Sequence, residues 1–252
     1  MSEWLVDNKE TPADQPSSAP RTARDRARVE IKGEILAAAR RHLASEGAPS
    51  LSLRAIAREL GMTSSAVYRY VTSRDDLLTW LIVDAYNALG ESAEDAESSV
   101  AREDLIGRFG ATCDAVRRWA LANPHEWALI YGSPVPGYVA PADTIGPASR
   151  VSLVLGAILV DAVRGDRVSE ELKNERVSAT LDSSHEPLRQ AIASEFPTAL
   201  IHQALMVWVA LYGMVSFELF GQLQNVVGEG PGERDEFFAQ CVRQWAKELG
   251  IR

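Results

Sequence analysis

Apolar residues recur at helical spacing along most of the chain. Between residues 30 and 45 they form a single stripe, which the Glu46-Gly47 pair ends. Beyond residue 75 the same periodicity predicts helices over 76–97, 102–122, 124–132, 147–164, 167–181, 184–194, 197–223 and 232–249. No stretch alternates with period two between turn signals, so we expect no sheet. The pattern therefore predicts an all-α protein, with a small N-terminal group of three helices and a larger helical part.

A helix, a glycine and a second short helix are predicted over 52–74, SLRAIARELGMTSSAVYRYVTSR. Gly61 tolerates a positive φ, so the first helix can end there and the next can begin three residues later. Thr63 or Ser64 can cap the second helix, which is rich in hydroxyls at its start and in aromatic and basic residues at its end. These features are typical of a helix-turn-helix whose second helix enters the major groove of DNA.

The distribution of charge supports that interpretation, although the net charge of −9 alone argues against a nucleic-acid binder. Residues 21–74 carry eleven Arg and Lys against five acids, a local net charge of +6. Residues 1–20 carry −3, and residues 75–252 carry −12. A basic module joined to an acidic body lets one face approach phosphates while the rest of the molecule is repelled.

Residues 1–28 are rich in Pro, Ser, Ala and Asp and then in Arg, which predicts a disordered basic arm. This arm could lie along DNA phosphates or enter a minor groove, or it could be an idle solvated tail. Its arginines are Arg21, Arg24, Arg26 and Arg28. The three helices over 29–75 form the predicted DNA-binding domain. Ser73, followed by two acids, starts a helix that leads into a predicted ligand-binding and dimerisation domain over 76–252.

Residues 31–82, above all LSLRAIARELGMTSSAVYRYVTSRDDLL, resemble the tetracycline-repressor (TetR) family of bacterial transcriptional regulators. Val71 departs from the family pattern, which more often has an aromatic residue there. Two later segments, 123–134 and 212–218, are similar to a subgroup with a tryptophan-containing C-terminal regulatory domain. The resemblance implies an all-α homodimer that binds a palindromic DNA operator and is released from it by a small ligand.

The resemblance also implies which residues contact DNA. Hydroxyl and small side chains at the start of the reading helix, 63–70, would face bases, and the tyrosines and Arg74 would hold phosphates. Arg54 and Arg69 could reach either, and one of the two tyrosines could instead pack mainly against its own domain. The implied contacts are Arg54, Thr63, Ser64, Ser65, Ala66, Tyr68, Arg69, Tyr70 and Arg74.

Two C-terminal segments are candidates for a homodimer interface. The segment 199–220 is apolar all round, so every face of it must be covered. A second subunit could supply part of that cover, and the alternative is complete burial within one subunit. The segment 234–249 has one apolar stripe with charges opposite. The predicted interface residues are Leu205, Val209, Tyr212, Gly213, Ser216, Phe238, Val242 and Trp245.

Large apolar residues on the body helices could line a pocket for a small-molecule effector of unknown identity, or they could form simple core. The candidates are Phe109, Trp119, Trp127, Tyr131, Leu153, Ile158 and Trp208. Asp182 and His185 form one carboxylate-x-x-His pair, which does not make a di-metal site. No phosphate-binding loop or catalytic Ser, His and Asp order stands out. We therefore expect no cofactor, no metal and no enzymatic activity.

Cellular location and function follow from these points. Cys113 and Cys241 match no zinc or redox spacing, which favours reduced thiols. No signal peptide is evident, and the longest uncharged apolar run, 204–217, is too short to span a bilayer, so we expect a soluble cytoplasmic protein. The favoured function is a ligand-responsive DNA-binding repressor. The alternative is an all-helical carrier or enzyme in which 52–74 is merely structural.

Overall fold

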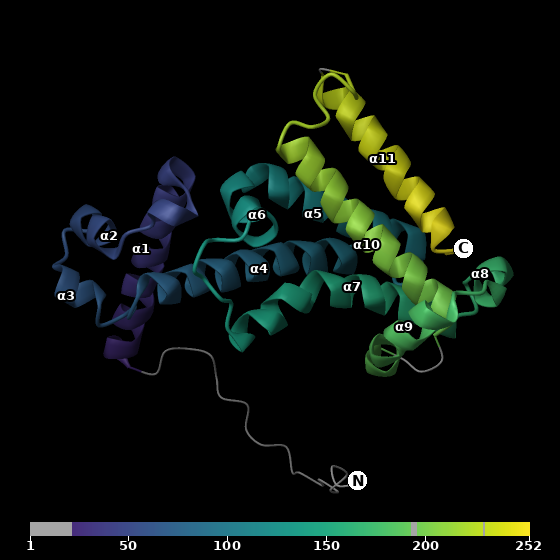
Figure 1. Ribbon diagram of the computed structural model, residues 1–252, viewed down its shortest axis with the longest axis horizontal. Coiled ribbons are helices and arrows are strands. Elements are labelled where there is room, and N and C mark those ends of the chain that lie inside the picture. Colours follow the sequence, from purple (N-terminus) through teal and green to yellow (C-terminus); the bar gives the residue numbers. More distant parts are fainter. Residues whose placement is uncertain (1–21, 193–195, 229) are drawn as a thin grey trace, which may run out of the picture.

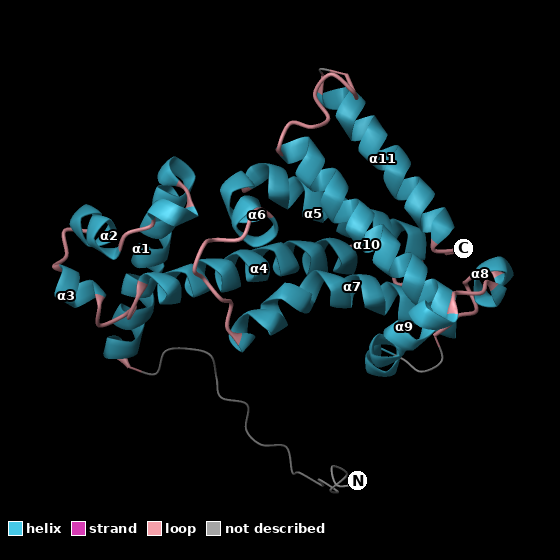
Figure 2. Cartoon of the chain, in the orientation of Figure 1, coloured by secondary structure: helices cyan, strands magenta, loops and turns pink. Residues whose placement is uncertain are grey.

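The computed structural model describes residues 22–192, 196–228 and 230–252. Within these ranges the chain is helical, and its one extended pairing is an isolated antiparallel bridge between Val168 and Ile251. Figure 1 shows a small group of helices at one end, which we call the head, and a larger bundle, which we call the body. Figure 2 shows that loops alone join the helices. The predicted all-α fold in two parts is confirmed.

The head is built from three helices and the first turns of a fourth. Its elements are α1 (Ala23–Glu46), η1 (Ala48–Ser50), α2 (Leu53–Glu59) and α3 (Ser64–Val67). Helix α4 (Arg74–Ser98) starts in the head and continues into the body. As predicted, Ser73 caps α4, where its hydroxyl accepts a hydrogen bond from the Asp76 amide at 3.0 Å. The core of the head unites Ile35, Ala38, Ala39, Leu43, Leu53, Ile56, Ala57, Val67, Val71, Leu77, Leu78 and Leu81.

The body packs the rest of α4 against the remaining helices around a separate apolar core. Helix α10 crosses this bundle in Figure 1, with α11 beside it and the helices α8 and α9 at its first turns. The elements are α5 (Leu105–Ala122), α6 (Pro124–Tyr131), η2 (Ala142–Thr144), α7 (Ile145–Arg164), α8 (Glu170–Asn174), α9 (Ala179–Ile192), α10 (Thr198–Leu219) and α11 (Pro231–Glu248).

Three arginines tie body helices together. Arg108, whose side chain is fully buried, donates hydrogen bonds to Glu97 of α4 at 2.6 Å and to Asp161 of α7 at 2.7 Å. Arg117 on α5 makes two 2.6 Å hydrogen bonds to Glu218 of α10. Arg150 on α7 makes hydrogen bonds of 2.8 and 2.6 Å to Glu94 of α4 and also bonds the Asn87 carbonyl at 2.8 Å. Charge-assisted pairs of this kind fix the helices relative to one another.

Helix α6 and the loop that follows it connect the body to the head. Leu129, Val135 and Tyr138 pack against the core of the head, and the Tyr138 hydroxyl lies 2.9 Å from the Thr79 hydroxyl on α4. Arg40 on α1 forms an ion pair with Asp84 farther along α4. The head is therefore held by α4, by the α6–α7 loop and by this ion pair.

Several predicted boundaries are wrong. Helix α1 begins at Ala23, where a disordered segment was predicted, because the Thr22 hydroxyl caps it by accepting from the Asp25 amide at 3.1 Å. Residues 1–21 of the predicted arm lie outside the described residues. The predicted helix 167–181 is replaced by the bridge at Val168 and the short α8, and α9 already begins at 179. The bridge holds 168 in extended backbone, so a continuous helix cannot form there.

Candidate nucleic-acid interface and effector pocket

The turn between α2 and α3 has the geometry that its sequence predicts. Gly61 has a φ of +65°, in the left-handed region that favours glycine. The Thr63 hydroxyl caps α3 by accepting from the Ala66 amide at 3.3 Å. Ser52 occupies the N-cap position of α2, but its side chain makes no capping hydrogen bond. The close of α2 and the start of α3 are therefore fixed by two local signals, a glycine and a threonine.

Helix α3 turns its apolar side inward and its hydroxyl side outward. Val67 of α3 and Val71, which follows the helix, are fully buried in the core of the head. Thr63, Ser65, Tyr68 and Arg69 are exposed, and the hydroxyls of Thr63 and Ser65 lie 3.1 Å apart. A short helix with an exposed polar face and a rigid apolar back has the form that fits a DNA groove.

Not every predicted DNA contact is equally accessible. Ser64 and Ala66 are half-buried, although they still lie on the first turn of α3. Tyr70 is half-buried and packs against the core of the head. Of the two tyrosines, Tyr70 is thus the packing residue, whereas Tyr68 keeps 47% of its surface exposed.

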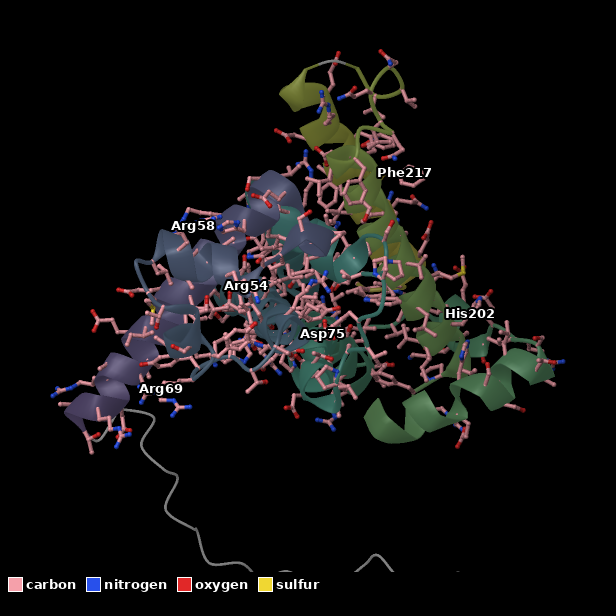
Figure 3. The ribbon with its side chains drawn as sticks, turned by 60° about the vertical axis from the view of Figure 1, so that its left-hand side comes forward. Arg54, Arg58, Arg69, Asp75, His202 and Phe217 are labelled. Carbon is pink, nitrogen blue, oxygen red and sulfur yellow. The ribbon has the colours of Figure 1, made fainter. Side chains whose placement is uncertain are left out.

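The exposed arginines of α2 and of the turn after α3 leave the head with free positive charge. Arg54, Arg58 and Arg69 are exposed, and in the described part of the chain none of them forms an ion pair. Figure 3 shows Arg58 and Arg69 on the outer side of the head, far from Phe217 on α10. Arg58 was not among the predicted contacts, although it follows Arg54 by one helical turn and so shares its face. That spacing is the signal that could have identified it.

Arg74 has a structural partner instead of a free guanidinium. Its Nη2 atom donates to the carbonyls of Ala48 at 2.9 Å and Pro49 at 3.3 Å, and its Nη1 atom lies 3.5 Å from Asp75. The side chain is 33% exposed. The observed contacts of Arg74 therefore hold η1 against the start of α4, and its phosphate contact stays a prediction.

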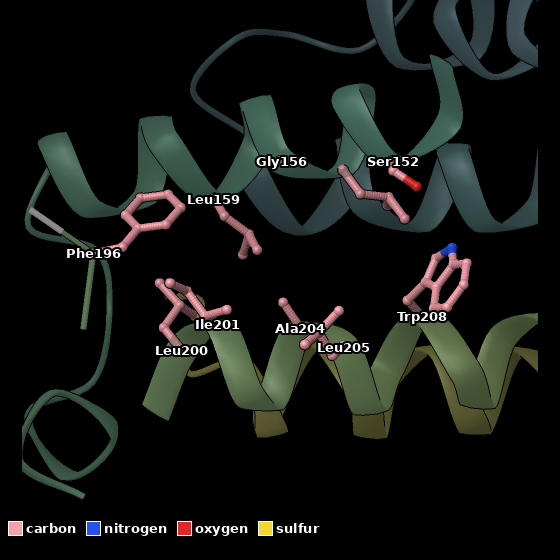
Figure 4. Close-up of a pocket in the computed structure, with 10 residues that line it drawn as sticks. Ser152, Gly156, Leu159, Phe196, Leu200, Ile201, Ala204, Leu205 and Trp208 are labelled. Atoms are coloured by element: carbon pink, nitrogen blue, oxygen red, sulfur yellow. The ribbon is translucent and has the colours of Figure 1, made fainter. Parts of the chain in front are cut away.

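The body contains a partly open apolar pocket of about 240 Å³ between α7 and α10. Figure 4 shows residues of α7 along one wall, residues of α10 along the other and Phe196 at one end. The hydroxyl of Ser152 and the indole of Trp208 supply polar atoms among side chains that are otherwise apolar. The lining residues are Ser152, Leu155, Gly156, Leu159, Phe196, Leu200, Ile201, Ala204, Leu205 and Trp208.

Of the seven predicted pocket residues, Trp208 alone lines this pocket. Phe109, Trp127 and Ile158 are buried in the body core, and Trp119 and Tyr131 pack against that core. Leu153 is 65% exposed, because it lies on a different face of α7 from the pocket wall. The pocket was missed because small residues such as Gly156 and Ala204 create it, whereas the prediction followed large ones.

Several of the predicted core aromatics contact one another. The ring of Tyr131 lies 4.6 Å, centre to centre, from both Trp127 and Tyr212. Burial raises the pKa of Tyr131 strongly, and the neighbouring Tyr212 raises it further, so this phenol stays protonated. The Trp127 indole donates to the Ser216 hydroxyl at 3.1 Å. These residues therefore pack α6 against α10.

The predicted dimer interface also needs correction. The α11 residues Phe238, Val242 and Trp245 are buried in the body core of a single subunit because their stripe faces inward, and Tyr212 of α10 is buried in the same core. The Ser216 hydroxyl accepts a hydrogen bond from the Trp127 indole, and Leu205 lines the pocket between α7 and α10. Val209 and Gly213 are exposed on α10. Other exposed large apolar residues on α10 and α11 are Met206, Trp208, Phe217 and Phe237.

The fold and the exposed face of α3 define a helix-turn-helix protein with a helical regulatory body. Residues 35–79 match the N-terminal domain of bacterial regulatory proteins of the tetR family, and residues 109–245 match a tetracyclin repressor-like C-terminal domain. The chain belongs to the TetR family of transcriptional regulators, whose DNA-binding helix-turn-helix it carries.

Individual relatives agree with this assignment. The HTH-type transcriptional regulators Rv1816 of Mycobacterium tuberculosis and Mb1846 of Mycobacterium bovis are each 43% identical over 82% of this chain and 88% of their own length. The crystal structure of the candidate regulatory protein SCO4313 has a TM-score of 0.72 at 32% identity, over 90% of this chain and all of that one. The relatives of this chain are transcriptional regulators, so the chain is a regulator and not an enzyme.

Proposed function

We propose that this regulator is a repressor that binds a palindromic operator as a homodimer and releases it when an apolar small molecule enters the body. The observation that carries the DNA-binding part is the exposed face of α3, where Thr63, Ser65, Tyr68 and Arg69 surround a rigidly buried Val67. Two such helices, spaced about 34–36 Å apart, would enter successive major grooves.

Some residues of this face would contact base edges, and others would contact backbone phosphates. Ser65 and the half-buried Ser64 and Ala66 lie on the first turn of α3, where they would meet base edges. Tyr68 and the free guanidinium groups of Arg54 and Arg69 extend farther and would contact phosphates or, for the arginines, a base. Thr63 would stay at the groove edge because its hydroxyl already caps α3.

A second copy of this chain would cover the outer face of α10. Met206, Val209 and Phe217 on this helix are 54%, 62% and 55% exposed, and Gly213 lies between them. Their spacing of three or four residues, with Gly213 included, places them on one stripe. An exposed apolar stripe on a soluble protein marks an interaction surface, and a palindromic operator requires two reading heads.

The pocket between α7 and α10 would hold the effector. Among the described residues, its lining offers no charged side chain and few polar atoms, so it favours a neutral, mainly apolar molecule that can form a hydrogen bond with the Ser152 hydroxyl or the Trp208 indole. An ionised ligand would have to be desolvated there without a counter-charge.

Effector binding would reach the head through α7 and α4. Helix α7 forms one wall of the pocket, and Arg150 on the same helix grips Glu94 and Asn87 of α4. Helix α4 in turn contributes Leu77, Leu78 and Leu81 to the core of the head. A shift of α7 would therefore change the spacing of the two heads and lower DNA affinity by reciprocal linkage. A dimer that is cross-linked with the head spacing of the effector-free state should keep DNA bound when the effector is added. Release of the DNA would contradict coupling through α7 and α4.

The site of action would be the cytoplasm, where the operator is found. Two segments, 142–164 and 198–219, are long and apolar enough to cross a membrane by length and composition. In the fold both are body helices: α7 packs against α4 and α5, and α10 packs against α5, α8 and α9. Part of their apolar surface is covered by this packing and by the pocket, and the proposed dimer face would cover more of α10.

Selection of DNA from a random pool by the purified full-length protein tests the proposal. We expect enrichment of a palindrome, because a twofold dimer presents two identical heads. A Ser65→Ala variant should lose preference at one or two base pairs of each half, whereas Tyr68→Ala should weaken binding to all sequences. Enrichment of a single half-site would contradict the dimeric mode, and no enrichment would contradict sequence-specific binding altogether.

A further inference from the structure

Helix α1 continues well beyond the core of the head. All nine residues from 22 to 30 are exposed, Ile31 is the first half-buried residue, and Ile35 is the first fully buried one. At 1.5 Å per residue this extension is roughly 13 Å long. Figure 1 shows that it leaves the head at the end of α1 nearer to α3 than to α6. We call residues 22–30 the α1 extension.

The extension is an ordered helix and not a loose arm. Thr22 and Asp25 cap it reciprocally: the Thr22 hydroxyl accepts from the Asp25 amide at 3.1 Å and donates to the Asp25 carboxylate at 2.7 Å. The following residues include alanine and arginine, which are strong helix formers. Because the extension continues a helix that is already packed, it avoids the nucleation penalty of an isolated short helix. Its charges are therefore held at fixed positions.

The positions of the charges follow from the helical register. Arg24 and Arg28 are one turn apart and share a face with Ile31 and Ile35, the face that packs into the head. This face is thus apolar inside the head and cationic where α1 leaves it. Lys32 prolongs it, and its ammonium group lies 4.3 Å from the centre of the Trp80 ring on α4. Within the described chain neither Arg24 nor Arg28 forms an ion pair.

The positive charge on the Arg24 and Arg28 face of the α1 extension favours a polyanion as its partner. Asp25 is committed to the cap, and Glu30 lies on the opposite side of the helix from Arg28 by register. Val29 is the one large apolar residue of the extension, which is too little for a protein or lipid contact. The same head carries the unpaired Arg54, Arg58 and Arg69, and the extension leaves it at the end nearer to α3 (Figure 1).

We propose that Arg24 and Arg28 bind backbone phosphates of duplex DNA that flank the base pairs read by α3. This proposal rests on the proposed function and adds an outer contact to each half of the operator. Arg24 and Arg28 lie about 6 Å apart along the helix axis, which matches roughly 2 base pairs at 3.4 Å each, so each half-site becomes longer by about that amount. The contact is independent of sequence because it involves phosphates alone.

The test compares two lengths of one duplex, the palindrome that the full-length protein selects from random DNA. The short duplex ends one base pair outside the selected positions, and the long duplex carries eight further base pairs of arbitrary sequence on each side. Binding is measured by fluorescence anisotropy across a salt series. The test variant is Arg24→Gln/Arg28→Gln, because glutamine keeps helix propensity. The control is Arg167→Gln/Arg176→Gln, which removes two exposed arginines from the body.

The wild type and the control should bind the long duplex at least about tenfold more tightly than the short one at physiological salt. The test variant should bind both lengths alike, and its log–log salt slope on the long duplex should fall by up to ~3.6, at about 0.9 for each of four phosphates in a dimer. Circular dichroism should show unchanged helix content.

Other outcomes separate the two proposals. If the test variant retains the length preference and the salt slope of the wild type, the flanking contact is refuted while operator binding stands. If the variant weakens equally on both duplexes, the arginines act inside the half-site, and the flanking position is wrong. If the wild-type protein binds neither duplex, both the proposed function and this inference fail.

Discussion

Substitution of two arginines of the head, Arg74 and Arg69, should affect different properties of the protein. Both were implied by sequence as DNA contacts, but the structure gives them different environments. The Arg74 guanidinium donates to two carbonyls of η1, at 2.9 and 3.3 Å, whereas Arg69 is exposed and makes no ion pair with the described residues. We expect Arg74→Ala to act mainly on stability and Arg69→Ala to act on DNA affinity alone.

The size of the stability effect follows from the bonds that Arg74→Ala removes. A hydrogen bond to a charged group contributes about 1.5–3 kcal/mol when buried. The Arg74 side chain is 33% exposed, so water can replace part of the loss, and we expect destabilisation of about 1–2 kcal/mol. For a chain of this length that corresponds to a fall in Tm of about 2–8 °C. Arg69→Ala should change stability by less than about 0.5 kcal/mol.

Thermal unfolding followed by circular dichroism and DNA affinity measured across a salt series separate the two effects. Arg69→Ala should lower the log–log salt slope by up to ~1.8 in a dimer, because one phosphate contact is lost in each subunit. Arg74→Ala should leave most of that slope in place at temperatures where the head is folded. If Arg74→Ala instead keeps the wild-type Tm and loses as much slope as Arg69→Ala, Arg74 is a phosphate anchor and our assignment is wrong.

Further predictions concern the turn, the pocket and the body. Gly61→Ala should destabilise the head by about 1 kcal/mol, because the φ of +65° is strained for alanine even though no atom blocks its Cβ; an unchanged Tm would contradict this. Ala204→Phe should fill the pocket and abolish effector response while DNA affinity persists, and a response retained in DNA-release assays would place the effector elsewhere. Arg117→Met should cost about 3 kcal/mol in chemical denaturation by leaving Glu218, 5% exposed, without its partner, and Arg117→Met/Glu218→Leu should recover part of it; equal stability of the two variants would refute that reason. Burial raises the pKa of the Cys113 thiol, so iodoacetamide at pH 8 should modify Cys113 only in unfolded protein, as mass spectrometry would detect.

The helix-turn-helix could be predicted from sequence because its determinants are local. Gly61 can take a positive φ, Thr63 can cap the next helix, and Ser73 can cap α4, whatever the rest of the chain does. The same local reasoning failed at 22–28, where composition suggested disorder. There the cap at Thr22 and the continuity with a packed helix outweigh the lack of apolar residues.

The pocket and the burial of the α11 stripe could not be predicted, because both depend on which helices meet. Periodicity identified an apolar stripe on α11 but not its partner, and Phe238 and Trp245 turn out to cover the core of their own subunit. The pocket is a place where side chains are small, at Gly156 and Ala204, so a search for large residues points elsewhere. Helix packing over long sequence separations decides both.

The affinity of the purified protein for a duplex from its own upstream region, measured from low to high salt together with the mass of the complex, tests the central claim most directly. Binding should weaken linearly on a log–log plot as phosphate contacts release counterions, and the complex should contain two subunits. A protein that remains monomeric, and whose association with duplex DNA does not change with salt, would contradict the account.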